Sequence, residues 1–427
     1  MKNSTPLHLG EKIRQIRVAK GLSQENLAYA IGKSKSHMSR LERGESEFDD
    51  EMLEATKKYL GIEKSPLLPF ELEMFRSRIW YWNELAHNHR WDEAKAVREE
   101  LSHILDLPYE RELTLLYKMI EARMLFKEND DPAVEERLSY VEGFLNEAST
   151  DVLYLYHRVK GTLLYSIDHK NAMKHFLLAL EYNNNEQRPD VALLVLIGYT
   201  CTYAGKLLQA TRYFERYIQE YRGDRTHALL CQAEHYLAIC YAVSGELDEA
   251  KKLFESSLAK ARNTRAKTLL GQALADMGYI NARMGNYKAA HDFYNDALQY
   301  FQESSVLYVM ALTLKAAYLI ELNDYDACKS ILDEAKTLAE NNEELLIFIE
   351  ATRHEMTLND KQSTDYLETV AIPFYISRGG IDYLDAAVRL CDKLEAQYLK
   401  RGAARKADAI ARISRDIYKR LIYGPEA

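Results

Sequence analysis

The stretch GLSQENLAYAIGKSKSHMSRLERG, residues 21–44, contains two short helix patterns that are separated by a glycine turn. A serine at the N-cap begins each pattern, Ser23 in the first and Ser34 in the second. Apolar residues then recur at helical spacing, and in the second pattern they are Met38 and Leu41. Two helices of about nine residues joined by a turn of three or four residues with a glycine form a helix-turn-helix.

If Met38 and Leu41 are buried, the polar residues of the second helix must point outward. Lysine and arginine can reach guanine O6 and N7 in a DNA major groove, while serine adapts to either base edge. The residues in this position are Lys35, Ser36, Ser39 and Arg40. Residues 11–44 contain eight Lys/Arg and three Glu, a net charge of +5 that favours contact with phosphates. A helix pair with a solvated basic face would need no DNA, so the spacing alone leaves that alternative open.

Residues 9–61 resemble the Xre/lambda-repressor-type helix-turn-helix domain, through LGEKIRQIRVAKGLSQENLA, IGKSKSHMSRLERGE and LEATKKYLGI. The resemblance covers nearly every motif position of that five-helix fold and predicts a DNA-binding domain over residues 1–62. It implies that Gln24 contacts a DNA phosphate, and that Arg17 and Glu42 form a structural pair between the first and third helices. His37 is bulkier than the residue at this position in many members, and we expect it to touch a phosphate or to lie in solvent. The base-reading edge implied by the resemblance is Ser34, Lys35, Ser36, Ser39 and Arg40.

The whole chain has 427 residues, 47% of them apolar, and a formal net charge of −9. Leu, Ala, Glu and Lys recur at helical spacing almost from end to end, so the fold class is predicted to be all-α. Five cysteines form no CxxC pair, which favours reduced and buried thiols. We find no secretory leader and no apolar run long enough to span a bilayer, so we expect a cytoplasmic protein with no membrane partner.

Pro66 and Pro69 indicate a linker over residues 63–73, because prolines disfavour helix on their N-terminal side. Beyond the linker the chain repeats, most clearly in IGYTCTYAGKLLQATRYFERYI, LAICYAVSGELDEAKKLFESSL, MGYINARMGNYKAAHDFYNDAL and AAYLIELNDYDACKSILDEA. Small residues follow one another at intervals of 40, 40 and 38 residues, each with a large apolar residue four positions later. These small residues are Ala210, Ala250, Ala290 and Cys328.

The repeat resembles the tetratricopeptide repeat, in a variant slightly longer than the usual period of about 34 residues. A small residue lets the two helices of a hairpin approach, and a large one fills the groove to the next hairpin. Residues 74–421 are therefore predicted to form about nine hairpins that stack as a right-handed superhelix with a concave inner surface.

Helix phase places ten residues on the predicted concave surface, where polar and aromatic groups could bond a peptide backbone or stack on its side chains. Any single one of them is equally well explained as an ordinary surface residue or as a contact between helices. The ten are Arg158, Tyr199, Tyr203, Gln232, His235, Tyr236, Gln272, Asp276, Tyr279 and Arg283.

An Xre-type head followed by about nine such hairpins resembles the RRNPP group of peptide-sensing regulators from Gram-positive bacteria, and its NprR-like branch in length and number of repeats. The resemblance implies a transcription regulator that forms a homodimer or higher homo-oligomer and binds double-stranded DNA at a two-fold operator. A short intracellular signalling peptide would alter its DNA binding or oligomeric state, as in quorum sensing. Many members hold the peptide with asparagines, but the matching positions here are Leu196, Tyr236, Asp276 and Leu314, so that feature does not carry over.

No phosphate-binding loop, GxSxG, HExxH, GxGxxG or paired-cysteine metal motif occurs, so we expect no enzyme, no cofactor and no metal site. The alternative function is a protein-interaction scaffold that binds a response regulator or another protein, with the DNA-binding head secondary. The C-terminal residues 400–420 carry a net charge of +6 and could meet an acidic partner. Such a run is more often a solvated helix face.

Overall fold

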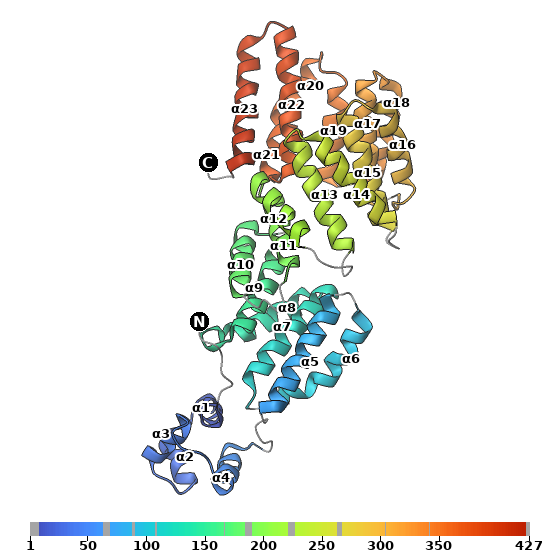
Figure 1. Cartoon of the computed structure of the whole chain (residues 1–427). Helices are drawn as coiled ribbons and strands as arrows, with labels where there is room; N and C mark the ends of the chain where they lie inside the picture. Colours follow the sequence, from blue (N-terminus) through green and yellow to red (C-terminus); the bar gives the residue numbers. More distant parts are fainter. Residues whose placement is uncertain are drawn as a thin grey trace. The chain divides into compact units, whose positions relative to one another are not determined.

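The computed structural model describes residues 8–62, 69–87, 90–106, 109–165, 167–183, 190–220, 227–262, 267–303, 305–340 and 342–423. Every regular element in these ranges is helical, which confirms the all-α fold class (Figure 1). The chain divides into two compact units. Unit 1 comprises residues 1–163 and 174–189, and unit 2 comprises residues 164–173 and 190–427.

The N-terminal head contains α1 (Leu9–Ala19), α2 (Gln24–Ala30), α3 (Lys35–Glu42) and α4 (Asp50–Leu60). The serine caps form as the sequence indicates, because Ser23 Oγ accepts from the backbone N–H of Asn26 and Ser34 Oγ from that of His37, both at 3.1 Å. The apolar faces of the helices form the core of the head, with Ile13, Leu27, Met38 and Leu41 fully buried.

The sequence predicted five helices in this domain, and the described residues of the head hold four. The following helix, α5 (Pro69–His87), packs against α6 (Trp91–Leu101) and α7 (Arg111–Lys127) instead. The predicted linker over residues 63–73 is therefore too long, since α5 already begins at Pro69. Proline is accepted in the first turn of a helix, where its missing N–H would have had no partner. Residues 63–68 lie outside the described residues.

The remaining helices follow one another in packed pairs (Figure 1). In unit 1, α7 pairs with α8 (Asp131–Glu142), and α9 (Thr150–Leu164) pairs with α10 (His169–Tyr182), which crosses the boundary between the units. Short 3₁₀ segments lie at Ser102–Asp106 and Leu145–Glu147.

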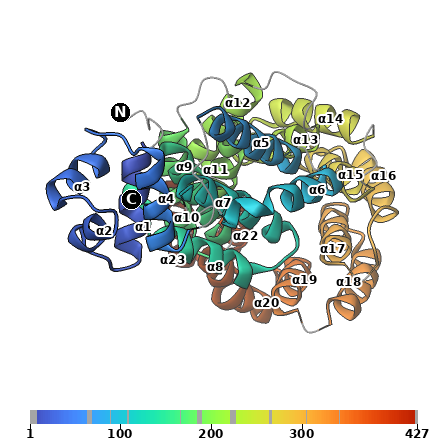
Figure 2. The same cartoon turned by 90° about the horizontal axis from the view of Figure 1, so that it is seen from below.

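The pairs of unit 2 are α11 (Ala192–Tyr203) with α12 (Leu207–Glu220), α13 (His227–Val243) with α14 (Leu247–Arg262), α15 (Lys267–Arg283) with α16 (Tyr287–Leu298), α17 (Val306–Glu321) with α18 (Tyr325–Ala339), α19 (Glu343–Glu355) with α20 (Lys361–Tyr366), and α22 (Ile381–Lys400) with α23 (Ala404–Tyr423). A π-helical segment at Leu367–Ala371 and α21 (Ile372–Arg378) stand between the last two pairs. Successive pairs follow an arc, with α13, α15 and α17 on its inner side and α14, α16 and α18 outside (Figure 2).

Small residues at the centre of each pair explain how closely its helices pack. A Cβ atom added at Gly198 of α11 would lie 2.6 Å from the ring of Phe214 on α12, and one at Gly278 would lie 2.9 Å from Tyr294. The repeated small residues are fully buried, as the sequence pattern requires, and so are the large residues four positions later. These are Ala210, Ala250, Ala290 and Cys328, followed by Phe214, Phe254, Tyr294 and Leu332.

All five cysteines are buried and free. Across the ranges given above, no helix is both long and apolar enough to cross a membrane. Nor do the described side chains of His, Cys, Asp and Glu form a group of three or more that could hold a metal ion.

Candidate nucleic-acid interface and ligand surface

A buried ion pair fixes α3 against α1. Arg17 of α1 donates from Nε to Glu42 Oε1 at 2.6 Å and from Nη2 to Oε2 at 2.9 Å, with 9% and 1% of the two side chains exposed. Arg17 Nη1 also donates to the carbonyl of Leu22 at 2.6 Å, at the start of the turn before α2. Paired hydrogen bonds between a guanidinium and a carboxylate fix orientation as well as distance. The helix that carries the predicted reading edge is therefore held in one direction.

The predicted reading edge lies on the outer face of α3 and reaches solvent. Ser34, Lys35, Ser36 and Arg40 are exposed, whereas His37 and Ser39 are half-buried. The Ser34 oxygen already accepts a hydrogen bond as the helix cap, but its hydroxyl proton can still donate to a phosphate or a base. Lys35 lies 3.9 Å from Glu25 in an exposed, loose ion pair. Such a pair contributes little free energy, so Lys35 can leave it for another partner.

Gln24 makes a contact within the head that the sequence pattern did not indicate. Its Nε2 donates to Glu42 Oε2 at 2.7 Å, so the side chain belongs to the same network as Arg17. The predicted phosphate contact would require this side chain to turn, or the backbone N–H at the start of α2 to make the contact instead. A hydrogen bond between residues that are 18 positions apart leaves no trace in helix periodicity.

In unit 2, α11, α13 and α15 bring several of the predicted peptide-contacting residues together. Tyr199 on α11 donates from its hydroxyl to Gln232 Oε1 on α13 at 3.1 Å, and its ring centroid lies 4.7 Å from that of Tyr236. Tyr203, at the end of α11, is 43% exposed. These side chains form an aromatic and polar surface on neighbouring helices.

A charged group adjoins this aromatic surface. His235 Nδ1 lies 2.5 Å from Asp276 Oδ2 on α15. Burial alone would lower the pKa of His235, but the nearby Asp276 carboxylate reverses the effect and raises it. On the same face of α15, Arg283 Nη1 donates to the Tyr279 hydroxyl at 2.7 Å.

Three residues of α22 belong to this charged group, and no motif or repeat in the sequence indicates them. Asp385 lies 3.4 Å from Arg283 Nη1 and 2.9 Å from Arg389 Nε. Asp382, one turn earlier, is exposed at the surface of the helix, but the protein groups packed around it displace part of its water and raise its pKa to about 6. The negative charges of Asp385 and Asp276 add to this rise. The repeat pattern has no position for these residues, because α22 follows a long interval that includes the π-helical segment.

Two of the residues predicted to contact a peptide do not take part in the contacts described above. Arg158 stands on α9 in unit 1 and is buried, with 8% of the residue exposed. Gln272 is half-buried at the start of α15.

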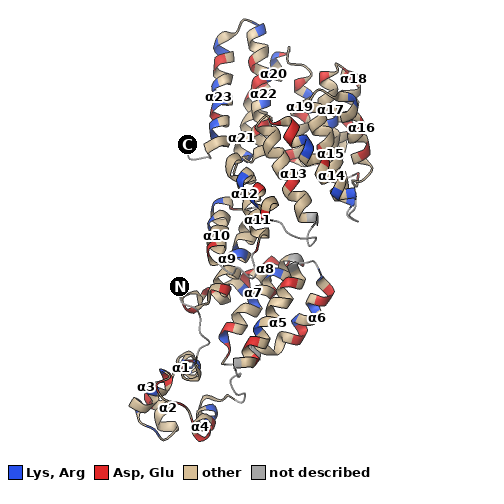
Figure 3. Ribbon diagram, viewed as in Figure 1, with Lys and Arg blue, Asp and Glu red and all other residues tan. Residues whose placement is uncertain are grey.

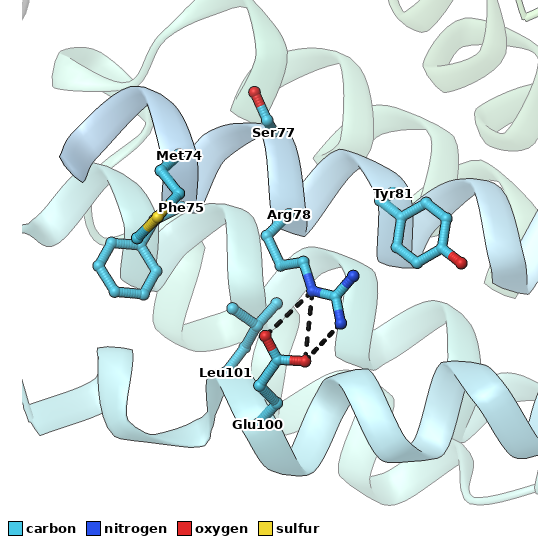
Figure 4. A pocket seen from close by; sticks show the side chains of 7 residues that line it. All are labelled: Met74, Phe75, Ser77, Arg78, Tyr81, Glu100 and Leu101. Atoms are coloured by element: carbon cyan, nitrogen blue, oxygen red, sulfur yellow. Dashed lines mark hydrogen bonds and ion pairs between the residues drawn. The ribbon is translucent and has the colours of Figure 1, made fainter. Parts of the chain in front are cut away.

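A separate pocket of about 380 Å³ lies between α5 and α6 in unit 1 (Figure 4). Met74, Phe75 and Leu101 line its apolar part, and Arg78 and Glu100, which also line it, form an ion pair with an Nη2–Oε2 distance of 2.5 Å. None of the residues that the sequence singled out lies in this pocket.

The basic C-terminal stretch forms most of α23, on which Lys and Arg recur along the helix (Figure 3). Arg412 pairs with Asp408 one turn away at 2.6 Å, and both side chains are more than half exposed. This arrangement is typical of a solvated helix face.

Two domain families match the sequence. The helix-turn-helix domain family matches residues 8–66, and the tetratricopeptide repeat family matches residues 229–303. The control protein C.BamHI of Bacillus amyloliquefaciens is 37% identical over 71 residues, which are 16% of this chain and 88% of the relative. The transcriptional activator NprA of Geobacillus stearothermophilus is 20% identical over 403 residues, 91% of this chain and 98% of the relative.

The fold is similar to that of NprR. The apo form of the quorum sensor NprR from B. thuringiensis superposes with a TM-score of 0.66 at 19% identity, over 81% of this chain and 99% of that one. NprR in complex with its cognate peptide NprX gives a TM-score of 0.62 at the same identity and coverage. The chain therefore belongs to the helix-turn-helix regulators, and with its tetratricopeptide-repeat array of NprR-like fold it has the architecture of the RRNPP group.

Proposed function

We propose that this protein is a cytoplasmic, sequence-specific transcription regulator that reads double-stranded DNA through α3 and binds a short signalling peptide through its array. Bound peptide alters the DNA affinity or the oligomeric state of a homodimer. The domain boundaries that we propose are residues 1–62 for the DNA-binding head and 69–423 for the array.

One observation carries the DNA-binding part of the proposal. The outward face of α3 presents Lys35, Ser36 and Arg40 to solvent, while the buried pair of Arg17 and Glu42 holds the same helix from behind. A rigid helix with exposed basic and hydroxyl side chains suits a major groove, where these groups can reach base edges. NprA, which aligns over nearly its full length, is named as a transcriptional activator.

Selection of bound duplexes from a randomised DNA pool tests this part. Wild type is expected to enrich a two-fold site, and Lys35→Ala/Arg40→Ala is expected to bind that site at least about 100-fold more weakly, because each base contact contributes about 1–3 kcal/mol. The matched control is Arg14→Ala/Lys58→Ala, which also removes one arginine and one lysine charge, but from exposed positions on α1 and α4. Enrichment by neither wild type nor the control would contradict the proposal.

The peptide-binding part is supported by the aromatic and charged side chains on α11, α13 and α15, and by the likeness of the fold to NprR, which has been solved with its peptide. A random library of short synthetic peptides should yield a ligand for the wild-type chain. We expect Tyr199→Ala and Asp276→Asn to weaken binding of the selected peptide about 10-fold or more, since each removes a side-chain group from this aromatic and charged surface. The control is Tyr325→Ala, an exposed tyrosine on the outer helix α18.

The alternative function, a protein-interaction scaffold, is favoured by one feature, the basic face of α23. It predicts that the purified chain selects no DNA sequence, while charge reversal on α23 abolishes binding of a purified acidic partner such as a response regulator. The two proposals therefore separate in the DNA selection itself.

A further inference from the structure

The residues just before α7 are packed into the head, although in the sequence they lie between α6 and α7 of the array. Tyr109 is 4% exposed and belongs to the apolar cluster of the head, with Ile13 of α1 and Leu60 of α4. Burial, together with the negative charge of Glu54 on α4, raises the pKa of the Tyr109 phenol to about 12. The head core is thus completed by a side chain from beyond α6.

The next residue forms a buried ion pair with the head. Lys12 Nζ of α1 lies 2.6 Å from Glu110 Oε1 and 2.9 Å from Oε2, with only 6% and 4% of the two side chains exposed. Two charges are removed from water together, so separation of the pair without rehydration would leave an uncompensated charge inside the protein. Such a pair favours one docked position over nearby ones.

The two residues after Glu110 point to the array. Arg111 lies over the Phe144 ring at 4.7 Å and reaches Glu147 at 3.3 Å. Glu112 accepts a hydrogen bond from Ser149, the residue before α9, and burial raises the pKa of its carboxyl. The start of α7 is therefore tied on one side to the head and on the other to the segment between α8 and α9.

We propose that residues 109–112 form a joint through which the array holds the helix-turn-helix head, with Tyr109 and Glu110 docked on α1 and α4 and with Arg111 and Glu112 anchored on the next hairpin. The docked face leaves the reading edge uncovered, because Lys35, Ser36 and Arg40 stay exposed while Tyr109 is buried. A movement of α7 relative to α9 would then turn the head. This last consequence rests on the proposed function, whereas the docking itself does not.

Hydrogen exchange of the full chain tests the docking. In Glu110→Ala, Lys12 loses its buried partner, so amide exchange in α1 and α4 should rise about 10-fold or more, with no change in the helices of unit 2. The control is Glu93→Ala, which breaks an exposed pair with Arg90 on the same array. Equal exchange of α1 and α4 in Glu110→Ala and wild type would overturn the proposal.

Two further comparisons separate docking from misfolding. The exchanged pair Lys12→Glu/Glu110→Lys should recover most of the protection that either single reversal loses. The Tyr109 hydroxyl has no hydrogen-bond partner among the described residues, so Tyr109→Phe should keep the protection of α1 and α4, while Tyr109→Ala should lose it. The proposed joint would be refuted if the double reversal protected the amides of α1 and α4 no better than either single reversal. It would also be refuted if these amides exchanged as fast in Tyr109→Phe as in Tyr109→Ala.

The effect on DNA binding is tested with the duplex that wild type selects. Insertion of five base pairs between its half-sites turns one half-site by about half a helical turn. Docked heads should bind this duplex about 100-fold more weakly than the parent, and the undocked heads of Glu110→Ala should lose less than about 10-fold. Equal losses would show that the joint does not orient the heads. If wild type selects no duplex, the proposed function fails, and the exchange experiment still decides the docking.

Discussion

At the scale of single residues, the pair of Arg17 and Glu42 is the interaction on which the orientation of α3 depends most. Removal of one partner leaves the other charge inside the protein, so Arg17→Ala should lower the free energy of unfolding of the head by about 3–5 kcal/mol. Hydrogen exchange of the α3 amides measures this value in the full chain.

The matched control for this prediction is Arg14→Ala on the same helix. Arg14 is 54% exposed and reaches Glu11 at 3.3 Å, so its loss should change the free energy of unfolding by no more than about 0.5 kcal/mol. Similar effects of the two substitutions would mean that the buried pair does not hold α3.

A second prediction at this scale concerns Asp382. Its pKa is about 6 in the fold and near 3.8 ordinarily, so the folded state binds its proton more tightly than the unfolded chain does. The stability that this proton contributes is fully present below pH 4 and is lost as the pH rises to 6. Asp382→Asn should therefore raise the free energy of unfolding above pH 6 by roughly 1 kcal/mol, a value reduced to allow for the water that reaches the exposed side chain.

The difference in thermal stability between wild type and Asp382→Asn at pH 4 and pH 7 measures this effect. We expect almost no difference at the lower pH and a more stable variant at the higher one. Asp292→Asn, on the exposed outer face of α16, is the control for loss of a carboxylate. A variant less stable than wild type at pH 7 would show that ionised Asp382 stabilises the array.

Sequence patterns predict side-chain contacts within one helix, but they do not predict contacts between helices. The serine caps and the inward side chains of α2 and α3 follow from spacing, because a cap serine and the backbone N–H that donates to it are three positions apart. The hydrogen bond of Gln24 to Glu42 joins two helices, and the ion pair of Asp385 with Arg283 joins residues 102 positions apart. Contacts of this kind depend on how elements pack, which no local pattern records.

At the scale of elements, the closeness of paired helices depends on glycine. A methyl group at Gly198 would stand 2.6 Å from the ring of Phe214, which is fully buried, so the ring would have to shift inside the core and Gly198→Ala should cost about 1–3 kcal/mol. Gly143, at the end of α8, has its nearest neighbour at 3.5 Å, and Gly143→Ala should change stability by less than about 0.5 kcal/mol. Chemical denaturation of both variants measures the difference, and equal stability would contradict this view of the packing.

The helix pairs were predictable because the same small and large residues recur at the same places in each copy. The start of α5 was not, since Pro69 is compatible both with a linker and with the first turn of a helix. Packing of α5 on α6 and α7 decides between the two, and that packing involves residues far from Pro69 in the sequence.

At the scale of the whole molecule, charge is unevenly divided along the chain. The chain carries −9 in total, and residues 1–62 carry +2 with a +5 segment at residues 11–44, which leaves −11 for residues 63–427. A negative array repels DNA, so contact with phosphates should be confined to the head. The order of head and array could be predicted from the sequence, and so could this distribution of charge, because both follow from composition and repeats. The joint at residues 109–112 could not, because neither Tyr109 nor Glu110 belongs to a motif.

Ionic strength provides the test of this division. If each head of a dimer neutralises a few phosphates, the logarithm of the DNA affinity should fall with the logarithm of salt concentration with a slope of about −4 to −8. The slope also reports what Lys35 and Arg40 do. If they read bases, Lys35→Ala/Arg40→Ala keeps a similar slope and loses its preference for the selected duplex, whereas loss of phosphate contacts would flatten the slope by about 0.9 for each contact. Arg14→Ala/Lys58→Ala should retain the preference, and a wild-type slope near zero would contradict DNA binding through the head.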